Sequence, residues 1–344
     1  MNVSIAIPTY NRAAEVEKTL VGLSRLDTTG CPDHEVLVID NNSTDGTVEV
    51  VNRLAPLFDG RLRCVREVQQ GLNQGRNRAT QEARYEIVAY LDDDVNVDPK
   101  WLWHLSDAYA SGDVAGVGGR AYLVYPSPKP TWLGESIEGL LTKVELGPHR
   151  RPAGVDELYG VNMSFRKDWL RRAGGFRPDL DRVGTRLTGG GDDEMIRRVV
   201  ALGGVMLYEP GAVVGHRVPP ARMRRRWFWN RCFWGGATEP RIWPNERVTA
   251  YQLLRATWHV GRMSSRAVRA GMWRGPRSAD CFRQALNVAN RSGIWMGLLV
   301  ELWRGRERSS HDSGPAAPAL PISISLDRVR STRESLESQE VVLG

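Results

Sequence analysis

The chain has 344 residues, of which 41% are apolar and 25% charged, the composition of a globular protein with one sizeable domain and an appendage, or with two domains. Its four cysteines are scattered without a CxxC pair, which argues against a disulfide scaffold or a zinc module and favours a reduced, cytoplasmic setting. The N-terminus lacks the pattern of a signal peptide, and no apolar stretch approaches about 18 residues. We therefore expect a protein that is neither secreted nor bilayer-spanning.

The net charge of +7 conceals an asymmetry along the chain. Residues 217–308 contain 19 arginines, no lysine and 5 acidic residues, a net charge of +14, together with eight of the twelve tryptophans. The rest of the chain therefore sums to −7. Basic residues interleaved with tryptophan indicate either an anionic membrane surface or nucleic acid as a partner.

The first 110 residues alternate short apolar runs with helical patterns. The apolar runs predict strands at residues 3–7, 35–39, 62–65 and 87–91. Apolar residues spaced by three or four predict helices within residues 13–26, 48–54, 74–84 and 99–110. This alternation predicts an α/β, Rossmann-like fold with a mainly parallel sheet covered on both faces.

Polar clusters follow three of the predicted strands. They are Thr9-Tyr10-Asn11, Asp40-Asn41-Asn42 and Asp92-Asp93-Asp94. Ligands bind beyond the carboxyl ends of parallel strands, so we expect these clusters to share one edge of the sheet. Three adjacent carboxylates repel one another unless a cation compensates them, and Mg²⁺ or Mn²⁺ with substrate phosphates would do so. The alternative is an acidic turn in which Asp98 caps the helix that follows.

The sequence contains neither a G-x-G-x-x-G after the first strand nor a P-loop. Phosphates, if bound, would then be held by a metal and a basic side chain. Arg76 and Arg78 open the helix before the acidic strand. A solvated helix face is the better interpretation for Arg78.

Four spaced motifs over about the first 215 residues resemble the inverting GT-A glycosyltransferases of the large family-two type. They are residues 6–12 (AIPTYNR), 38–47 (VIDNNSTDGT), 75–79 (GRNRA) and 91–94 (LDDD). The resemblance implies a GT-A fold in which Thr9, Tyr10 and Asp40 hold the base and ribose. It also implies that Asp94 ligates Mn²⁺ or Mg²⁺ at the sugar-nucleotide diphosphate. The full set of donor-binding residues that we expect is Pro8, Thr9, Tyr10, Asn11, Asp40, Arg76, Asp92, Asp93 and Asn162.

A catalytic base is expected at the start of a later helix. The family carries a Glu-Asp-x-Glu/Asp motif with an arginine six residues after the Asp and a glycine eleven after it. Counting back from Arg198 and Gly203 places the base at Asp192, with Asp193 as the second candidate. Gly191 stands where the family has Glu, so the choice between the two aspartates stays open.

His216 follows the last predicted strand, residues 205–208. A lone histidine is often structural, but in this family a histidine here commonly reaches the metal or the diphosphate. We therefore expect Asp94 and His216 to be the metal ligands. Metal would bind the neutral imidazole.

We expect residues 1–216 to form the catalytic domain and residues 309–344 to form a disordered tail. Helical patterns at residues 251–263, 279–289 and 294–303 indicate that residues 217–308 form a basic, Trp-rich helical extension. It would associate with an anionic membrane surface, or alternatively pack on the core. The acidic strand ends make nucleic acid the wrong partner.

The function that follows is metal-dependent, inverting transfer of a sugar from a nucleotide-diphosphate donor, UDP first, to a hydroxyl of a glycan or lipid-linked acceptor. The expected location is cytoplasmic and peripheral, at the inner face of the cell membrane. The alternative is a non-catalytic nucleotide-sugar-binding or membrane-scaffold protein.

Overall fold

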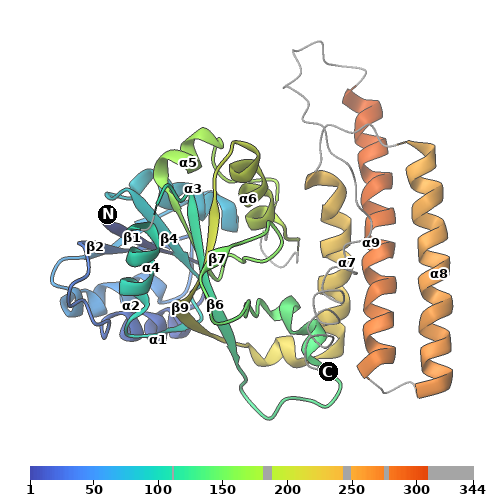
Figure 1. Ribbon diagram of the computed structural model, residues 1–344, viewed down its shortest axis with the longest axis horizontal. Helices are drawn as coiled ribbons and strands as arrows, with labels where there is room; N and C mark the ends of the chain where they lie inside the picture. Colours follow the sequence, from blue (N-terminus) through green and yellow to red (C-terminus); the bar gives the residue numbers. More distant parts are fainter. Residues whose placement is uncertain (111, 181–187, 243–248, 275–278, 309–344) are drawn as a thin grey trace, which may run out of the picture. The chain divides into compact units, whose positions relative to one another are not determined.

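A computed structural model describes residues 1–110, 112–180, 188–242, 249–274 and 279–308 (Figure 1). The strands are β1 Val3–Thr9, β2 His34–Asp40, β3 Leu62–Arg66, β4 Ile87–Leu91, β5 Val95–Val97, β6 Gly116–Val124, β7 Arg151–Pro152, β8 Asn162–Arg166 and β9 Met206–Arg217. The α-helices are α1 Ala13–Leu23, α2 Thr47–Leu54, α3 Leu72–Glu82, α4 Trp101–Ala110, α5 Lys167–Arg172, α6 Gly191–Ala201, α7 Arg225–Ile242, α8 Ala250–Arg274 and α9 Ala279–Arg308. Short 3₁₀ helices are η1 Ala55–Phe58, η2 Glu135–Leu141 and η3 Pro220–Met223.

All of these strands belong to one sheet, in the order β3-β2-β1-β4-β8-β6-β9-β5, with β7 added beside β9. The first four neighbours are parallel, as the alternation of strands and helices predicted. Antiparallel pairing of β8, β5 and β7 makes the second half of the sheet mixed. For β8 the reason is its connection from β6, which contains only η2 and β7 and so lacks the crossover α-helix that a parallel return requires.

The core is built on the central strands. Every residue of β2 and of β4 is buried, as expected for strands whose two faces are both covered by helices. Leu37 and Ile39 are fully buried, and each such side chain contributes about 1.5–3 kcal/mol through removal from water. This rigid centre fixes the ends of β1, β2 and β4, where the polar clusters begin.

β9 differs from the prediction of a strand at residues 205–208 followed by a separate segment. It is one strand of 12 residues, and its register with β6 shifts between Gly119 and Ala121. Pro210 lies in this irregular part, where a residue without an N–H is tolerated. His216 therefore lies inside β9, paired with Val95 of β5, and does not follow the last strand.

The helices after residue 217 join the rest of the fold in one compact unit that spans Met1–Arg304. A second core cluster connects η2 with α7 and α9 and comprises Leu133, Ile137, Leu141, Val218, Phe228, Cys232, Phe282, Leu286 and Ala289. α9 is a single helix where two were predicted. It approaches α7 so closely that a Cβ at Gly293 would lie 2.0 Å from the carbonyl oxygen of Phe233. The predicted tail at 309–344 lies outside the described residues.

Crossing a bilayer requires a long apolar helix, and none of the described helices meets that requirement.

Candidate active site

A cavity opens where β1 and β4 end, and most of the predicted donor residues line it, together with one predicted metal ligand and one predicted base. Those residues are Pro8, Thr9, Tyr10, Arg76, Asp92, Asp93, Asp94 and Asp192. The prediction that the polar strand ends share one edge of the sheet is thereby supported for the first and third clusters. From the second cluster Asn41 reaches the lining.

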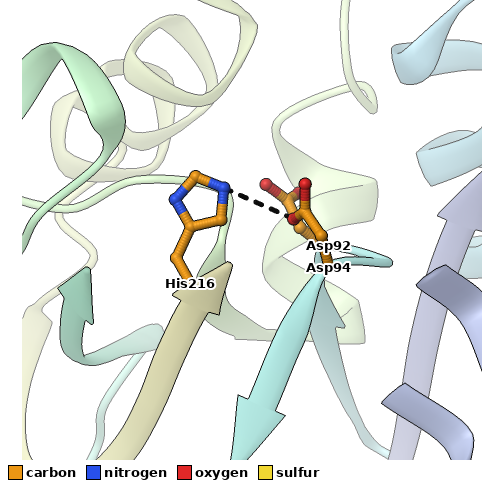
Figure 2. Close-up of side chains that lie close together, drawn as sticks. All are labelled: Asp92, Asp94 and His216. Carbon is orange, nitrogen blue, oxygen red and sulfur yellow. Dashed lines mark ion pairs between the residues drawn. The ribbon is translucent and has the colours of Figure 1, made fainter. Parts of the chain in front are cut away.

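Asp92 and Asp94, which line the cavity, come together with His216, which is buried beside them and is not among the lining residues of the described chain (Figure 2). One potential ligand atom from each lies within 4.8 Å of the others. Asp94 and His216 are buried, and the His216 Nε2 atom lies 3.4 Å from an Asp94 carboxylate oxygen. Two carboxylates and an imidazole form an oxygen–nitrogen donor set that suits Mn²⁺.

A backbone carbonyl near His216 fixes which ring nitrogen carries the hydrogen. Its Nδ1 atom lies 2.8 Å from the Leu141 carbonyl oxygen. A carbonyl can only accept, so Nδ1 carries the hydrogen and donates it, and the neutral ring keeps its lone pair on Nε2. Nε2 faces Asp94, and the guanidinium of Arg222 lies 3.3 Å away from it. The residues present therefore fit a divalent metal.

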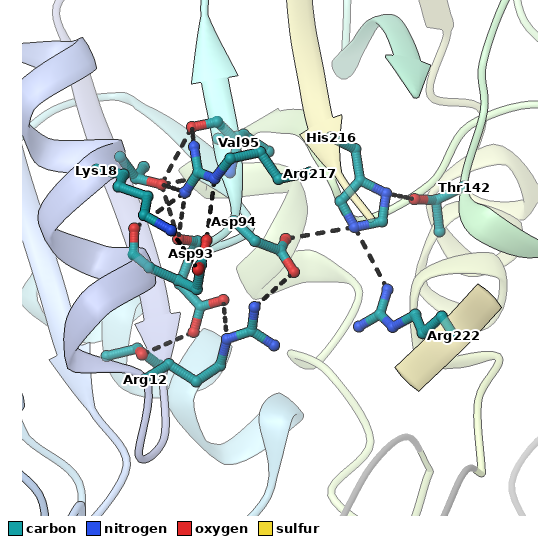
Figure 3. Close-up of polar contacts among 12 residues, drawn as sticks. Arg12, Lys18, Asp93, Asp94, Val95, Thr142, His216, Arg217 and Arg222 are labelled. Carbon is teal, nitrogen blue, oxygen red and sulfur yellow. Dashed lines mark hydrogen bonds and ion pairs between the residues drawn. The ribbon is translucent and has the colours of Figure 1, made fainter. Parts of the chain in front are cut away.

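Asp93 also lines the cavity, and two residues near the end of β1 hold its carboxylate. Its carboxylate accepts a hydrogen bond of 2.7 Å from the Thr9 hydroxyl, and the Arg12 Nε atom lies 2.9 Å from its other oxygen (Figure 3). Asp93 and Asp94 lie in a turn between β4 and β5, not in an extended segment. Asp93 ties the end of β1 to the end of β4.

Arg12 is a site residue to which no role was predicted. It bridges two members of the acidic triplet, at 2.9 Å from Asp93 and 2.7 Å from Asp94. Burial alone would raise the pKa of Asp94, but a protonated His216, which would then donate to it from Nε2, together with Arg12 and Arg222, holds that pKa well below its usual range. Burial raises the pKa of Asp93, against the attraction of Arg12. Arg12 stands in the first motif, five residues after Ile7, a signal that could have identified it.

Asp192 lies in the first turn of α6, where a carboxylate is favoured by the helix dipole. Its Oδ2 atom accepts a hydrogen bond of 2.9 Å from the Gly160 amide, and it lines the cavity. Asp193 is not among the cavity-lining residues of the described chain. Burial first, and then the Asp192 and Asp156 carboxylates, raise the pKa of Asp193 well above its usual value. Since Asp192 lines the cavity and Asp193 does not, the geometry favours Asp192.

The glycines before Asp192 allow α7 to approach. A Cβ at Gly189 would lie 2.4 Å from the guanidinium of Arg231, and one at Gly190 would lie 2.7 Å from the Ile242 side chain. Gly190 also has φ 96°, a left-handed conformation that favours glycine. The extension therefore forms part of the site, since Arg222 and Arg231 both line the cavity. Sequence spacing carried no signal for these contacts.

Three predicted donor residues lie outside the cavity lining within the described chain. Asn11 accepts a hydrogen bond from the Thr44 amide, and Asp40 accepts one from the Ser43 amide.

Asn162 is engaged on all its polar atoms. Its amide nitrogen donates to the carbonyls of Ala212 and Arg120, and its oxygen accepts from the Trp101 indole. In this structure Asn162 ties β8 to its neighbours. Arg78 pairs with Glu82 on a partly exposed helix face, as expected for a solvated position.

Known proteins resemble this chain over its catalytic part and beyond. The chain is 26% identical over 238 residues to a glucosyl-dolichyl phosphate glucuronosyltransferase of Haloferax volcanii, covering 69% of this chain and 75% of that protein. It is 25% identical over 320 residues to the succinoglycan biosynthesis protein ExoM of Rhizobium meliloti, covering 90% and 98%.

One solved structure has a TM-score of 0.56 at 21% identity, covering 91% of this chain and 88% of its own. It is the mannosyltransferase PcManGT from Pyrobaculum calidifontis in complex with GDP-Man and Mn²⁺, and the likeness concerns the fold. Residues 4–174 match the sequence profile of glycosyl transferase family 2. Over that range the chain belongs to glycosyl transferase family 2, and its α/β fold is the GT-A fold.

Proposed function

We propose that this glycosyltransferase is an inverting, metal-dependent enzyme. It moves a sugar from a nucleotide-diphosphate donor, UDP first, to a hydroxyl of a glycan or lipid-linked acceptor. The observation that carries the proposal is the cavity in which Asp92 and Asp94, beside His216, face the same space as Asp192. That arrangement offers a place for a leaving diphosphate and a carboxylate to activate the acceptor.

On the donor side, Thr9 and Tyr10 at the end of β1 would contact the nucleotide, with Asp92 toward the ribose. Asn41 orders the neighbouring loop, because its amide donates to the Gln69 carbonyl and accepts from the Gly71 amide. The Arg76 side chain is buried in the cavity wall and supplies a positive charge near the phosphates.

Asp92, Asp94 and His216 would hold Mn²⁺ or Mg²⁺. When bound, the ion would stabilise the negative charge that develops on the leaving diphosphate. Arg12 holds the carboxylates of Asp93 and Asp94 in place. The Leu141 carbonyl keeps the His216 imidazole in the tautomer that leaves Nε2 available to a metal.

On the acceptor side, Asp192 would remove the proton from the attacking hydroxyl, on the face of the sugar opposite the leaving group. The Gly160 amide holds one carboxylate oxygen in a fixed direction. Asp193, which does not line the cavity within the described chain, would leave this task to Asp192.

A nucleotide-release assay tests the proposal. UDP-, GDP- and dTDP-sugars are supplied with Mn²⁺, and the released nucleotide is measured for the native chain and for Asp94→Asn and Asp93→Asn. We expect turnover with at least one donor, abolished by Asp94→Asn and reduced less by Asp93→Asn. Donor binding without turnover would favour the non-catalytic alternative, which the glycine at position 191 keeps open. Equal losses in the two variants would contradict the division of the triplet.

The proposed partners include an anionic membrane surface at the inner face of the cell membrane. Two observations support this: the net charge of +14 on residues 217–308 and relatives whose names refer to dolichyl phosphate and to succinoglycan biosynthesis. Nucleic acid is not among the proposed partners.

A further inference from the structure

One face of α8 is exposed and divided along its length into two edges. The apolar edge consists of Tyr251, Leu254, Trp258 and Val268, each between 58% and 71% exposed. The arginine edge consists of Arg255, Arg262, Arg266 and Arg269, all exposed. Both sets recur at helical spacing, so each set follows its own side of the exposed face.

The opposite face of α8 packs on the protein. Ala256 is buried, and the Trp295 indole of α9 donates a hydrogen bond of 3.1 Å to the Thr257 hydroxyl. This bond places Trp295 beside the apolar edge, and the two helices lie side by side (Figure 1). Met296 and Trp303 of α9 are exposed as well. Exposed apolar side chains are therefore present on both helices.

The charge on α8 is of one sign. Residues 250–274 contain no aspartate or glutamate, so the arginine edge has no acidic partner within the helix. The guanidinium of Arg262 stands 5.1 Å from the centre of the Trp258 ring and joins the two edges. An apolar strip bordered by arginine is the pattern of a helix that lies in the plane of a membrane interface.

The other possible binding partners of this face would compensate only one of its two edges. Nucleic acid would neutralise the arginines but leave the apolar edge in water. A second copy pairing through this face would cover the apolar edge but bring arginine close to arginine. A bilayer with anionic headgroups removes the apolar side chains from water and pairs the guanidiniums with lipid phosphates.

We propose that α8, with the adjoining exposed side chains of α9, is the membrane-docking surface of this protein. The apolar edge would enter the boundary between headgroups and acyl chains, with the arginine edge on anionic headgroups. α7 and the start of α9 belong instead to the second core cluster, through Phe228 and Phe282. This inference does not rest on the proposed reaction, because none of the residues of the two edges lines the cavity in the described chain.

The test is co-sedimentation of the full-length chain with vesicles. The vesicles contain phosphatidylcholine alone, or phosphatidylcholine with phosphatidylglycerol, at low and high salt. We expect binding to the anionic vesicles that weakens at high salt, because salt screens exposed charges. Strong binding that is independent of both lipid charge and salt concentration would contradict the role of the arginine edge.

Two double variants separate the contributions of the edges. Arg255→Gln with Arg266→Gln should weaken binding by about fivefold for each arginine, and Leu254→Glu with Trp258→Glu should abolish it. Trp103→Glu, a change at an exposed tryptophan of α4, is the matched control and should bind like the native chain. Circular dichroism and nucleotide release confirm that each variant is folded.

Three outcomes would overturn the proposal. Unchanged vesicle binding by both double variants would show that another surface docks. A dimer that the Leu254→Glu, Trp258→Glu variant converts to a monomer, without any vesicle binding by the native chain, would assign the face to a second copy. Tighter binding to RNA than to anionic vesicles, lost in the arginine variant, would assign it to nucleic acid. A chain that lacks turnover but docks would refute the proposed reaction alone.

Discussion

Gly160 links the donor side of the cavity with the candidate base, so replacing it by alanine tests the site as a unit. Its amide donates to Asp192, and a Cβ built there would lie 2.0 Å from the Arg76 guanidinium and 3.3 Å from the Asp192 carboxylate. Gly160 is not among the glycines with positive φ. Alanine is therefore compatible with the backbone, and the new contact alone determines the effect.

The size of the effect of Gly160→Ala follows from how far the new Cβ would overlap its neighbours. An ordinary contact begins near 3.4 Å, so the Arg76 guanidinium must move by about 1.4 Å, the difference between 3.4 and 2.0 Å. Arg76 is only 3% exposed, donates to Asn73 and lies over the Phe176 ring, so it cannot move freely. Overpacking of this kind costs about 1–3 kcal/mol of stability. A misplacement of about 1 Å in an active site can lower the rate about 100-fold.

The assay is nucleotide release at saturating Mn²⁺ with the donor found in the panel, together with thermal unfolding. We expect kcat/KM of Gly160→Ala to fall about 100-fold while the chain remains folded. Gly235→Ala is the matched control, because a Cβ at Gly235 in α7 meets no atom within 4 Å. A folded Gly160→Ala variant with native kcat/KM would refute the placement of Arg76 and Asp192 around this glycine.

Further predictions concern the base, the metal and the response to pH. Asp192→Asn should lower kcat by about 10²–10⁴-fold with donor binding retained, and Asp193→Asn should lower it far less; the reverse order in steady-state kinetics would make Asp193 the base. His216→Ala should raise the Mn²⁺ concentration for half-maximal activity at least about tenfold, and an unchanged titration would exclude His216 as a ligand. Burial alone would raise the pKa of Glu138. Hydrogen bonds from Lys129, Lys143 and Tyr125 outweigh this effect and hold that pKa at about 2. Because this pKa is lower in the folded chain than in the unfolded chain, ionised Glu138 stabilises the fold at pH values above about 4.5. That stabilisation is lost as the pH falls toward 2. Glu138→Gln should therefore cost about 2 kcal/mol near neutral pH, and denaturant unfolding that shows the same cost in acid would contradict this.

Local patterns in the chain were sufficient for the first half of the sheet and for the acidic cluster. The apolar runs that become β1, β2 and β4 are buried on both faces, so their hydrophobicity alone marked them. The three carboxylates are consecutive and follow β4 directly, so the sequence itself brings them to one strand end. These features depend on neighbours in sequence, and a sequence records them directly.

The rest depended on contacts between residues far apart in the chain. His216 obtains its tautomer from the carbonyl of Leu141, 75 residues earlier, because η2 and β9 meet. Arg12 reaches Asp94 across 82 residues, and α7 lies against Gly189 and Gly190. No local pattern encodes which distant backbone atom a side chain will contact. Those contacts depend on how the strands pair in the sheet and how the C-terminal helices pack. The sequence by itself determined the strands of the first half of the sheet and the triplet of carboxylates, and only the tertiary structure decided which cations and backbone groups surround that triplet.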